Sequence, residues 1–210
     1  MKDFKLKTFI VGPVRTNCYV MSNGTTGEAI VFDPGDMPDK IEQYLKEKNL
    51  TGKGILLTHG HFDHILGVKE LAESTKMKVY ALEKEAKLLQ DPQLNSSARV
   101  HRPCRVTADV LLKDQEEITL AGFTIRVIHT PGHTGGGACY YFPEEGILIS
   151  GDTLFREEIG RSDLPTGNGE QLVESIRQKL MLLADNVEVY PGHGAPTSIG
   201  HEREYNSYIG

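Results

Sequence analysis

Short apolar runs alternate with polar turn residues along the first part of the chain. The first three runs are rich in β-branched and aromatic residues, are separated by Gly and Asn, and lie at 6–11, 17–21 and 28–32. This pattern predicts strands that form an antiparallel opening to the fold. Apolar residues then recur at helical spacing after Pro38, a residue that the first turn of a helix tolerates, so we predict a helix from Pro38 to about Asn49.

A strand, a helix and a second strand follow. The strands are predicted at 52–57 and 78–82, and residues 65–72 between them would present the apolar face of a helix, so that the three elements make a βαβ unit. A short helix is predicted at 83–90. Residues 91–109 are mixed in polarity and rich in turn residues, so we expect them to be irregular, either as a substrate loop or as a plain surface excursion.

The second half has a similar order of elements. Its predicted strands lie at 116–120, 123–129, 138–142, 147–150 and 187–190, and its amphipathic helix lies at 171–183. Two sheets with helices outside fit this order better than one doubly wound sheet. No low-complexity segment or linker divides the halves, so we predict a single α/β layered domain over residues 1–210.

Composition narrows the classes of protein. The formal net charge is -6 and no Lys/Arg-rich run is present, which argues against a nucleic-acid partner because phosphate binding needs a basic surface. The three cysteines are widely spaced without a CxxC pair, as expected of reduced thiols. No stretch resembles a signal peptide or a membrane span. We therefore expect a cytoplasmic protein without a membrane partner, whose oligomeric state stays open.

Metal-ligand side chains gather directly after the apolar run 55–57, at His59, His61, Asp63 and His64. Alternate residues of an extended segment face the same way, so His59, His61 and Asp63 are expected to converge, and a turn into a helix would add His64. Three other β-like runs are followed by Gly and then by a residue that can bind a metal, namely His133, Asp152 and His193. A lone histidine on a strand is usually a core residue, so it is the repetition of this arrangement that predicts a metal site.

Imidazole and carboxylate ligands without cysteine favour zinc, with iron or manganese as alternatives. Six or seven ligands exceed what one tetrahedral ion uses, so we predict two divalent metal ions bridged by one carboxylate. Ligands spread over several loops leave coordination positions open for water, which zinc can ionise near neutral pH. Hydrolysis is the chemistry that this arrangement predicts.

The pattern His59-x-His61-x-Asp63-His64, with the three later ligands, resembles the metal signature of the metallo-β-lactamase superfamily. The resemblance implies an αββα sandwich of two mixed β-sheets with the metals at the sheet edges. It also implies one metal on His59, His61 and His133, a second on Asp63, His64 and His193, and Asp152 as the bridge. Asp33 matches the first motif of that family and would orient a ligand imidazole, although an Asp before Pro also suits a plain turn.

Within the superfamily, the segments 151–155 and 160–163 are similar to the glyoxalase II group, which hydrolyses acylated glutathione thioesters. The resemblance implies a small-molecule thioester substrate, attacked at its carbonyl by metal-bound hydroxide with Asp63 and Asp152 in catalytic roles. Arg161 would hold a carboxylate of the thiol carrier, or it is an ordinary exposed arginine. The commonest β-lactamases have Cys at the place of Asp152, which argues against antibiotic hydrolysis. The resemblance is to the compact branch of the glyoxalase II group, so we expect no counterpart of the helical domain that supplies glutathione contacts in the long form.

Other functions remain alternatives. Persulfide dioxygenases resemble the same group and would use one iron on His59, His133 and Asp152. A lactonase, a phosphodiesterase and a non-catalytic binding module are further alternatives, the last disfavoured because no ligand is missing. Among the remaining histidines, His129 and His101 are expected to be structural or solvent-facing, whereas His201 has no assigned role.

Overall fold

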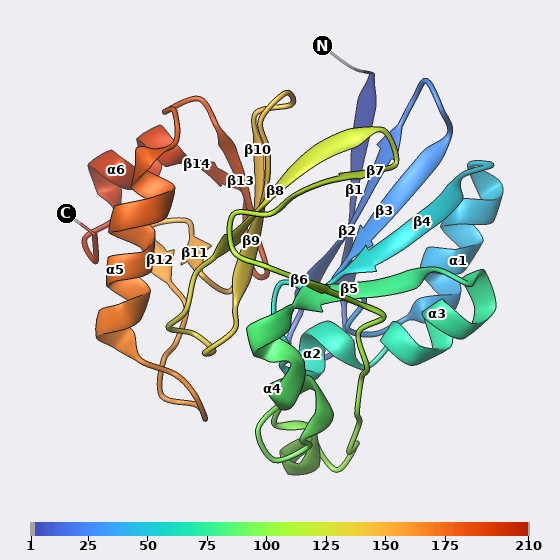
Figure 1. Cartoon of the computed structure of the whole chain (residues 1–210), viewed down its shortest axis with the longest axis horizontal. Helices are drawn as coiled ribbons and strands as arrows, with labels where there is room; N and C mark the ends of the chain where they lie inside the picture. Colours follow the sequence, from blue (N-terminus) through green and yellow to red (C-terminus); the bar gives the residue numbers. More distant parts are fainter. Residues whose placement is uncertain (1–2, 210) are drawn as a thin grey trace.

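The computed structural model describes residues 3–209, and residues 1, 2 and 210, at the ends of the predicted domain, lie outside the described residues. Two sheets face each other across the centre of the molecule, with α1 and α3 outside one sheet and α5 and α6 outside the other (Figure 1). The predicted αββα sandwich is therefore confirmed.

The first sheet has the strand order β1-β2-β3-β4-β5-β6. Its strands are β1 (Phe4–Val11), β2 (Thr16–Asn23), β3 (Glu28–Phe32), β4 (Thr51–Leu56), β5 (Lys78–Leu82) and β6 (Val110–Leu112). β1, β2 and β3 pair antiparallel, whereas β3 to β6 pair parallel. The antiparallel opening and the parallel βαβ unit are both confirmed, and β6 is a strand that was not predicted.

The second sheet has the strand order β14-β13-β10-β9-β8-β7. Its strands are β7 (Glu117–Leu120), β8 (Phe123–His129), β9 (Ala138–Phe142), β10 (Ile147–Gly151), β13 (Glu188–Pro191) and β14 (Thr197–Ser198). All its pairs are antiparallel except β10 with β13. A separate hairpin of β11 (Leu154–Phe155) and β12 (Glu158–Ile159) follows β10.

The helices are α1 (Pro38–Glu47), α2 (Phe62–Ile65), α3 (Val68–Thr75), α4 (Ala86–Gln90), α5 (Gly169–Lys179) and α6 (Ile199–Tyr205). None of those formed by residues 3–209 is long and apolar enough to cross a membrane. Residues 91–109 contain only the 3₁₀ turn Ser97–Val100, as the predicted irregular segment requires.

The predicted helical face at 65–72 is divided between two helices. Gly67 separates α2 from α3, and its N–H donates to the carbonyl of Pro34 at 2.9 Å. A Cβ at Gly67 would lie 2.7 Å from that carbonyl oxygen, so only glycine lets the segment pass this close to the end of β3. The break places Asp63 and His64 of the metal-ligand motif on a short helix of their own.

Three apolar layers hold the sandwich together. The central layer between the sheets includes Phe32, Phe123, Tyr140 and Phe142, all fully buried. An outer layer packs α1 and α3 on the first sheet through Ile41 and neighbouring residues, and another packs α5 and α6 on the second sheet. Burial of apolar area on this scale is the main stabilising contribution, and it fixes the strand ends that carry the polar site.

Candidate metal centre

The predicted ligands follow the ends of strands in both sheets, and the structure brings them together. Three sets of side chains place one ligand atom each within 4.8 Å of one another: His59 with His61 and His133, Asp63 with His64 and His193, and Asp33 with His59 and His64. The first two sets have the same members as the two groups implied by the family resemblance. We name them the imidazole group (His59, His61, His133) and the mixed group (Asp63, His64, His193).

The imidazole group is held by three buried rings. His133 Nε2 lies 2.8 Å from His61 Nδ1 and 3.2 Å from His59 Nε2. His133 Nδ1 donates to the backbone carbonyl of Arg161 at 2.6 Å, which leaves Nε2 with its lone pair free toward the centre. Burial lowers the pKa of His59 well below its usual value and that of His61 to about 3. Neutral imidazoles are the form that binds a metal.

The mixed group combines one carboxylate with two imidazoles. Asp63 Oδ2 lies 3.4 Å from His64 Nε2 and 3.3 Å from His193 Nε2. Desolvation alone would lower the pKa of His64, but the carboxylates of Asp63, Asp152 and Asp33 outweigh it and raise that pKa well above its usual value. The pKa of His193 is raised to about 9, because hydrogen bonds to Asp152 and Asp63 outweigh its desolvation. This part of the site therefore attracts positive charge.

Asp152 lies between the two groups. Its Oδ1 is 3.4 Å from His64 Nε2, whereas its Oδ2 is 3.5 Å from both His133 Nε2 and His193 Nε2. Gly192 allows this approach, because a Cβ there would lie 2.1 Å from Asp152 Oδ1. One carboxylate thus faces ligands of both groups, as a bridging residue must.

The local geometry of the motif differs from the prediction. His61 has an extended backbone, but Asp63 lies in the first turn of α2 rather than in a continued extended segment. The expectation that alternate residues of one extended segment align His59, His61 and Asp63 was therefore wrong. A helical turn turns Asp63 away from the imidazole group, and this is why the motif supplies both groups.

Asp33 ties the ends of β3 and β4 to the mixed group. Its Oδ1 accepts from the backbone N–H of Thr58 at 2.8 Å, and its Oδ2 accepts from Thr58 Oγ1 at 2.6 Å and from His64 Nδ1 at 2.9 Å. The last contact orients the His64 ring so that Nε2 faces Asp152. The residue also has a left-handed backbone with φ of 47°, so the turn interpretation and the orienting interpretation both describe it.

The buried atoms of the site fit a cation. His61 Nε2, His64 Nε2 and Asp152 Oδ1 are buried without a hydrogen-bond partner among the described residues. Asp33 accepts from His64 Nδ1, so once a cation displaces the Nε2 proton that the raised pKa of His64 retains, Nε2 and Asp152 Oδ1 are two acceptors that face each other at 3.4 Å. A bound cation would satisfy both atoms, and nitrogen and oxygen donors suit a borderline-soft divalent ion.

Several supporting residues were not found from the sequence. Thr16 Oγ1 donates to Asp63 Oδ2 at 2.8 Å, and Asn17 Nδ2 donates to the carbonyls of Pro191 and Gly194 on either side of His193. The buried Glu85 accepts from the N–H of Gly60 at 2.8 Å, and burial raises its pKa to about 7. Thr16 and Asn17 are far in sequence from the ligands that they support, and Glu85 lies within the predicted helix at 83–90, where an acidic residue is ordinary.

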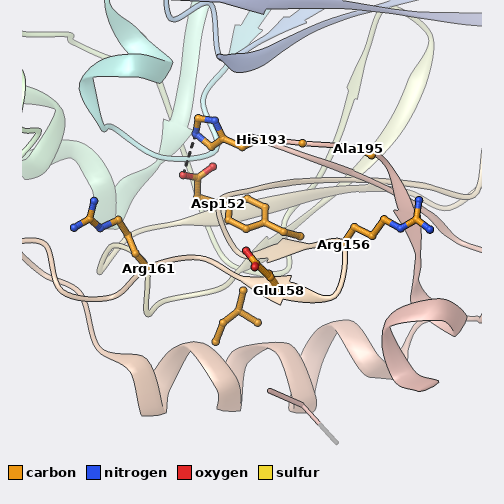
Figure 2. A pocket seen from close by; sticks show the side chains of 9 residues that line it. Asp152, Arg156, Glu158, Arg161, His193 and Ala195 are labelled. Atoms are coloured by element: carbon orange, nitrogen blue, oxygen red, sulfur yellow. Dashed lines mark ion pairs between the residues drawn. The ribbon is translucent and has the colours of Figure 1, made fainter. Parts of the chain in front are cut away.

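A cavity of about 530 Å³ opens beside the mixed group. Figure 2 shows Asp152 and His193 facing each other at its edge, with Arg161 on one side and Arg156 on the other. The side chain of Arg161 is 62% exposed and donates two hydrogen bonds of 2.7 Å to Asp163, so its charge is already paired with a neighbouring carboxylate. Its backbone carbonyl, in contrast, orients His133.

The remaining histidines lie outside both groups. His101 is exposed, and His129 is buried with Nε2 3.0 Å from the carbonyl of Gly135, as expected of solvent-facing and structural residues. The 91–109 segment reaches the site at Asn95, whose carbonyl accepts from the N–H of Phe62 at 2.9 Å, and at Ser96, which lines a hollow of about 180 Å³ together with His61 and Asp63.

Comparison with known proteins gives one family. Residues 11–193 match the family described as the Metallo-beta-lactamase superfamily. A "Probable metallo-hydrolase YqgX" of Bacillus subtilis is 39% identical over 98% of this chain and 97% of its own length. A "Hydroxyacylglutathione hydrolase GloC" of Haemophilus influenzae is 33% identical over 92% of each chain.

Solved structures agree over the whole fold. The "BLEG-1 B3 metallo-beta-lactamase" superposes with a TM-score of 0.93 at 41% identity, covering 98% of this chain and 99% of that one. "TTHA1623 in a di-iron-bound form" superposes with a TM-score of 0.85 at 32% identity, covering 96% of this chain and 99% of that one. Relatives of nearly equal length thus share the scaffold on which the two groups stand.

Proposed function

The chain belongs to the metallo-beta-lactamase superfamily, and from this premise we propose that it is a dinuclear metal-dependent hydrolase that cleaves a thioester such as an acylglutathione. The observation that carries the proposal is Asp152, whose two oxygens face ligands of both groups. The similarity to GloC supports the thioester class. Zinc is the proposed metal, with iron as the alternative that the di-iron form of TTHA1623 supports.

In this proposal the seven side chains His59, His61, Asp63, His64, His133, Asp152 and His193 hold the two ions. Two divalent cations bound there would supply the Lewis acidity that ionises water near neutral pH and stabilises a carbonyl oxyanion. Asp63 stays anionic, because His64 and His193 outweigh its desolvation and lower its pKa to about 2. It can therefore accept a hydrogen bond from the attacking water, while Thr16 holds its carboxylate in place.

The cavity beside His193 is proposed to bind the substrate. Phe155 and Ile159 give it apolar walls that suit an acyl group. Arg156 and Arg161 lie at its edge, where a carboxylate of the thiol carrier would compete with their present partners Glu157 and Asp163. No general acid is needed, because a thiol with a pKa of about 8.5 departs as its anion. This agrees with Asp152 at the cavity edge, whose desolvation is outweighed by His64 and His193, so that its pKa lies well below its usual value.

The test is metal analysis combined with activity on protein purified without added metal. About two divalent ions per chain with hydrolysis of lactoylglutathione would support the proposal. One iron per chain with oxygen uptake on glutathione persulfide would replace it with the dioxygenase alternative. Activity on neither substrate by the fully loaded enzyme would contradict the thioester assignment.

A second candidate is β-lactam hydrolysis, which the 41% identity to the BLEG-1 B3 metallo-beta-lactamase favours. The absence of a cysteine ligand argues only against the commonest class of zinc β-lactamases. A nitrocefin assay on the same preparation separates the two functions. A kcat/KM for nitrocefin greater than that for every thioester tested would favour the β-lactamase.

A further inference from the structure

The hairpin β11–β12 forms one wall of the cavity, through Phe155, Arg156, Glu158 and Ile159. Both ends of this hairpin are fixed at the metal centre. Asp152 lies just before β11, and Arg161, whose carbonyl accepts from His133 Nδ1, lies just after β12. A change in the position of the hairpin would therefore change the cavity directly beside the ligands.

The tip of the hairpin depends on contacts from elsewhere in the chain. Glu157 at the tip has a left-handed backbone with φ of 60°, a conformation that costs energy for a residue other than glycine. With only two residues in each strand, the hairpin has too few cross-strand hydrogen bonds to impose that conformation alone.

The helix α6 supplies the missing contacts. Glu202 Oε2 accepts from the backbone N–H of Glu157 at 2.8 Å, and His201 Nε2 lies 2.8 Å from Glu157 Oε1. Asn206 Nδ2 donates to the carbonyl of Glu158 at 3.1 Å. His201 and Glu202 of α6, with Asn206 directly after it, thus contact Glu157 at the tip of the hairpin and Glu158, the first residue of β12.

Glu202 is the centre of this arrangement. Its side chain is fully buried, and its carboxylate also accepts from Thr197 Oγ1 and from Asn206 Nδ2. A buried carboxylate is tolerated only when its acceptors are satisfied. The Glu157 N–H is one of its three donors, so the carboxylate and the hairpin tip stabilise each other.

We propose that Glu202, with His201 and Asn206, is a positioning residue that holds the β11–β12 hairpin in the shape that admits the substrate. The hairpin in this position sets the Phe155 ring edge-on to His193, with 6.1 Å between ring centroids. The terminal helix thereby controls substrate affinity without contacting substrate or metal. This inference rests on the proposed function, because it assigns the cavity to the substrate.

The mobility of the hairpin can be measured by tryptophan fluorescence, independently of enzyme activity. The chain contains no tryptophan of its own, so an introduced one reports on its position alone. Phe155→Trp places a single fluorophore in the hairpin. In that background Glu202→Gln should raise the acrylamide quenching constant about twofold, as a locally opened segment exposes the indole. Glu204→Gln, the same change at an exposed position of α6, should leave it unchanged. An unchanged constant in Glu202→Gln would overturn the proposal.

Steady-state kinetics of variants that keep Phe155 then test the role of Glu202 in substrate binding. Glu202→Gln should raise KM for the thioester about tenfold, the equivalent of one hydrogen bond to a charged group, with kcat within about twofold and metal content unchanged. A fall in kcat or in metal content with KM unchanged would overturn the proposal. If Glu202→Gln does not fold, His201→Ala, at a side chain 29% exposed, decides the matter by the same two measurements with smaller shifts in the same direction.

Failure of the proposed function gives a different result. A wild-type enzyme that cleaves no thioester contradicts the substrate assignment, while the quenching series still reports whether Glu202 holds the hairpin. The separate effects of Glu202→Gln on KM and kcat are then measured with the substrate that the wild type does accept.

Discussion

The two ligand groups stand side by side but differ in charge. The imidazole group consists of three buried rings, and burial lowers the pKa of two of them, His59 and His61. In the mixed group, carboxylates surround His64 and raise its pKa. One group is therefore built to stay neutral, and the other is built to accept positive charge even before a metal binds.

The two groups obtain their stability in different ways. The imidazole group needs rings in the correct tautomer, which backbone acceptors such as the Arg161 carbonyl provide. The mixed group needs a cation to offset its carboxylates, so it depends on the partners that hold those carboxylates and His64 in place. Asp152 faces both groups, so the proposed bridge would couple them.

Asp152→Ala should have the largest effect, because it removes the contact that both groups share. We expect a loss of kcat/KM on the order of 10³-fold, since Lewis-acid stabilisation is worth several kcal/mol and about 1.4 kcal/mol is tenfold in rate. Metal content measured by mass spectrometry should fall in the same variant. Retention of more than a small fraction of the wild-type rate would disprove the bridging role.

Asp33→Asn should weaken the mixed group more than the imidazole group. Asn tolerates the left-handed backbone at this position, but its amide cannot accept from both Thr58 and His64 as the carboxylate does. Loss of such an orienting partner typically costs about 10- to 100-fold in metal affinity. Competition with a chelator should release one ion per chain before the other, and simultaneous release of both would contradict the separate roles of the groups.

The sequence predicted those features of the two groups that depend on residues close together in the chain. The ligand motif at 59–64 and the strand–Gly–ligand repeats carry the chemistry within a few residues, so the members of both groups could be named. Thr16 could not, because it contacts Asp63 from 47 positions away and a threonine in a strand has no distinguishing signal.

The same limit applies to the fold. Long strands such as β8 were predicted with their observed bounds because alternation extends over several residues. β11, β12 and β14 have two residues each and show no periodicity. Their positions come from tertiary contacts such as that of Glu202 with Glu157, 45 positions apart.

In the metal-free protein, the stability contributed by the imidazole group and that contributed by the mixed group should depend on pH in opposite directions. The pKa of His61 is lowered from 6.5 to about 3 in the fold, so the unfolded chain binds more protons between these values, and stability should fall as the pH drops through that window. The pKa of His193 is raised from 6.5 to about 9, so the folded chain binds more protons there, and stability should fall as the pH rises through that window.

Urea unfolding of the chelator-treated protein across this pH range measures both the loss of stability at acidic pH (the acidic limb) and the loss at alkaline pH (the alkaline limb). His61→Gln should make the acidic loss of stability less steep and leave the alkaline loss in place, whereas His193→Gln should do the reverse; His59 and His64 retain the rest of each. A variant that flattens the limb assigned to the other group would show that the two groups do not titrate separately.

Thr16→Val should have a smaller effect, confined to the mixed group. The substitution keeps the shape of the buried side chain but removes the hydrogen bond to Asp63. Because Asp63 keeps its contacts with His64 and His193, we expect a loss of about 1 kcal/mol, or roughly fivefold in affinity for the ion of that group, by calorimetric titration. An equal loss at both ions would place Thr16 in a general structural role instead.

His129→Gln should change neither group. His129 ends β8 only four positions before His133, and it resembles a ligand by type, but its ring lies against the carbonyl of Gly135 and near Lys84 Nζ. Gln can still donate to that carbonyl, so metal content and kcat should match the wild type within error. Loss of one ion in this variant would mean that a ligand had been misplaced and that the imidazole group is larger than three rings. Retention of both ions would show that a position at a strand end is insufficient for ligation.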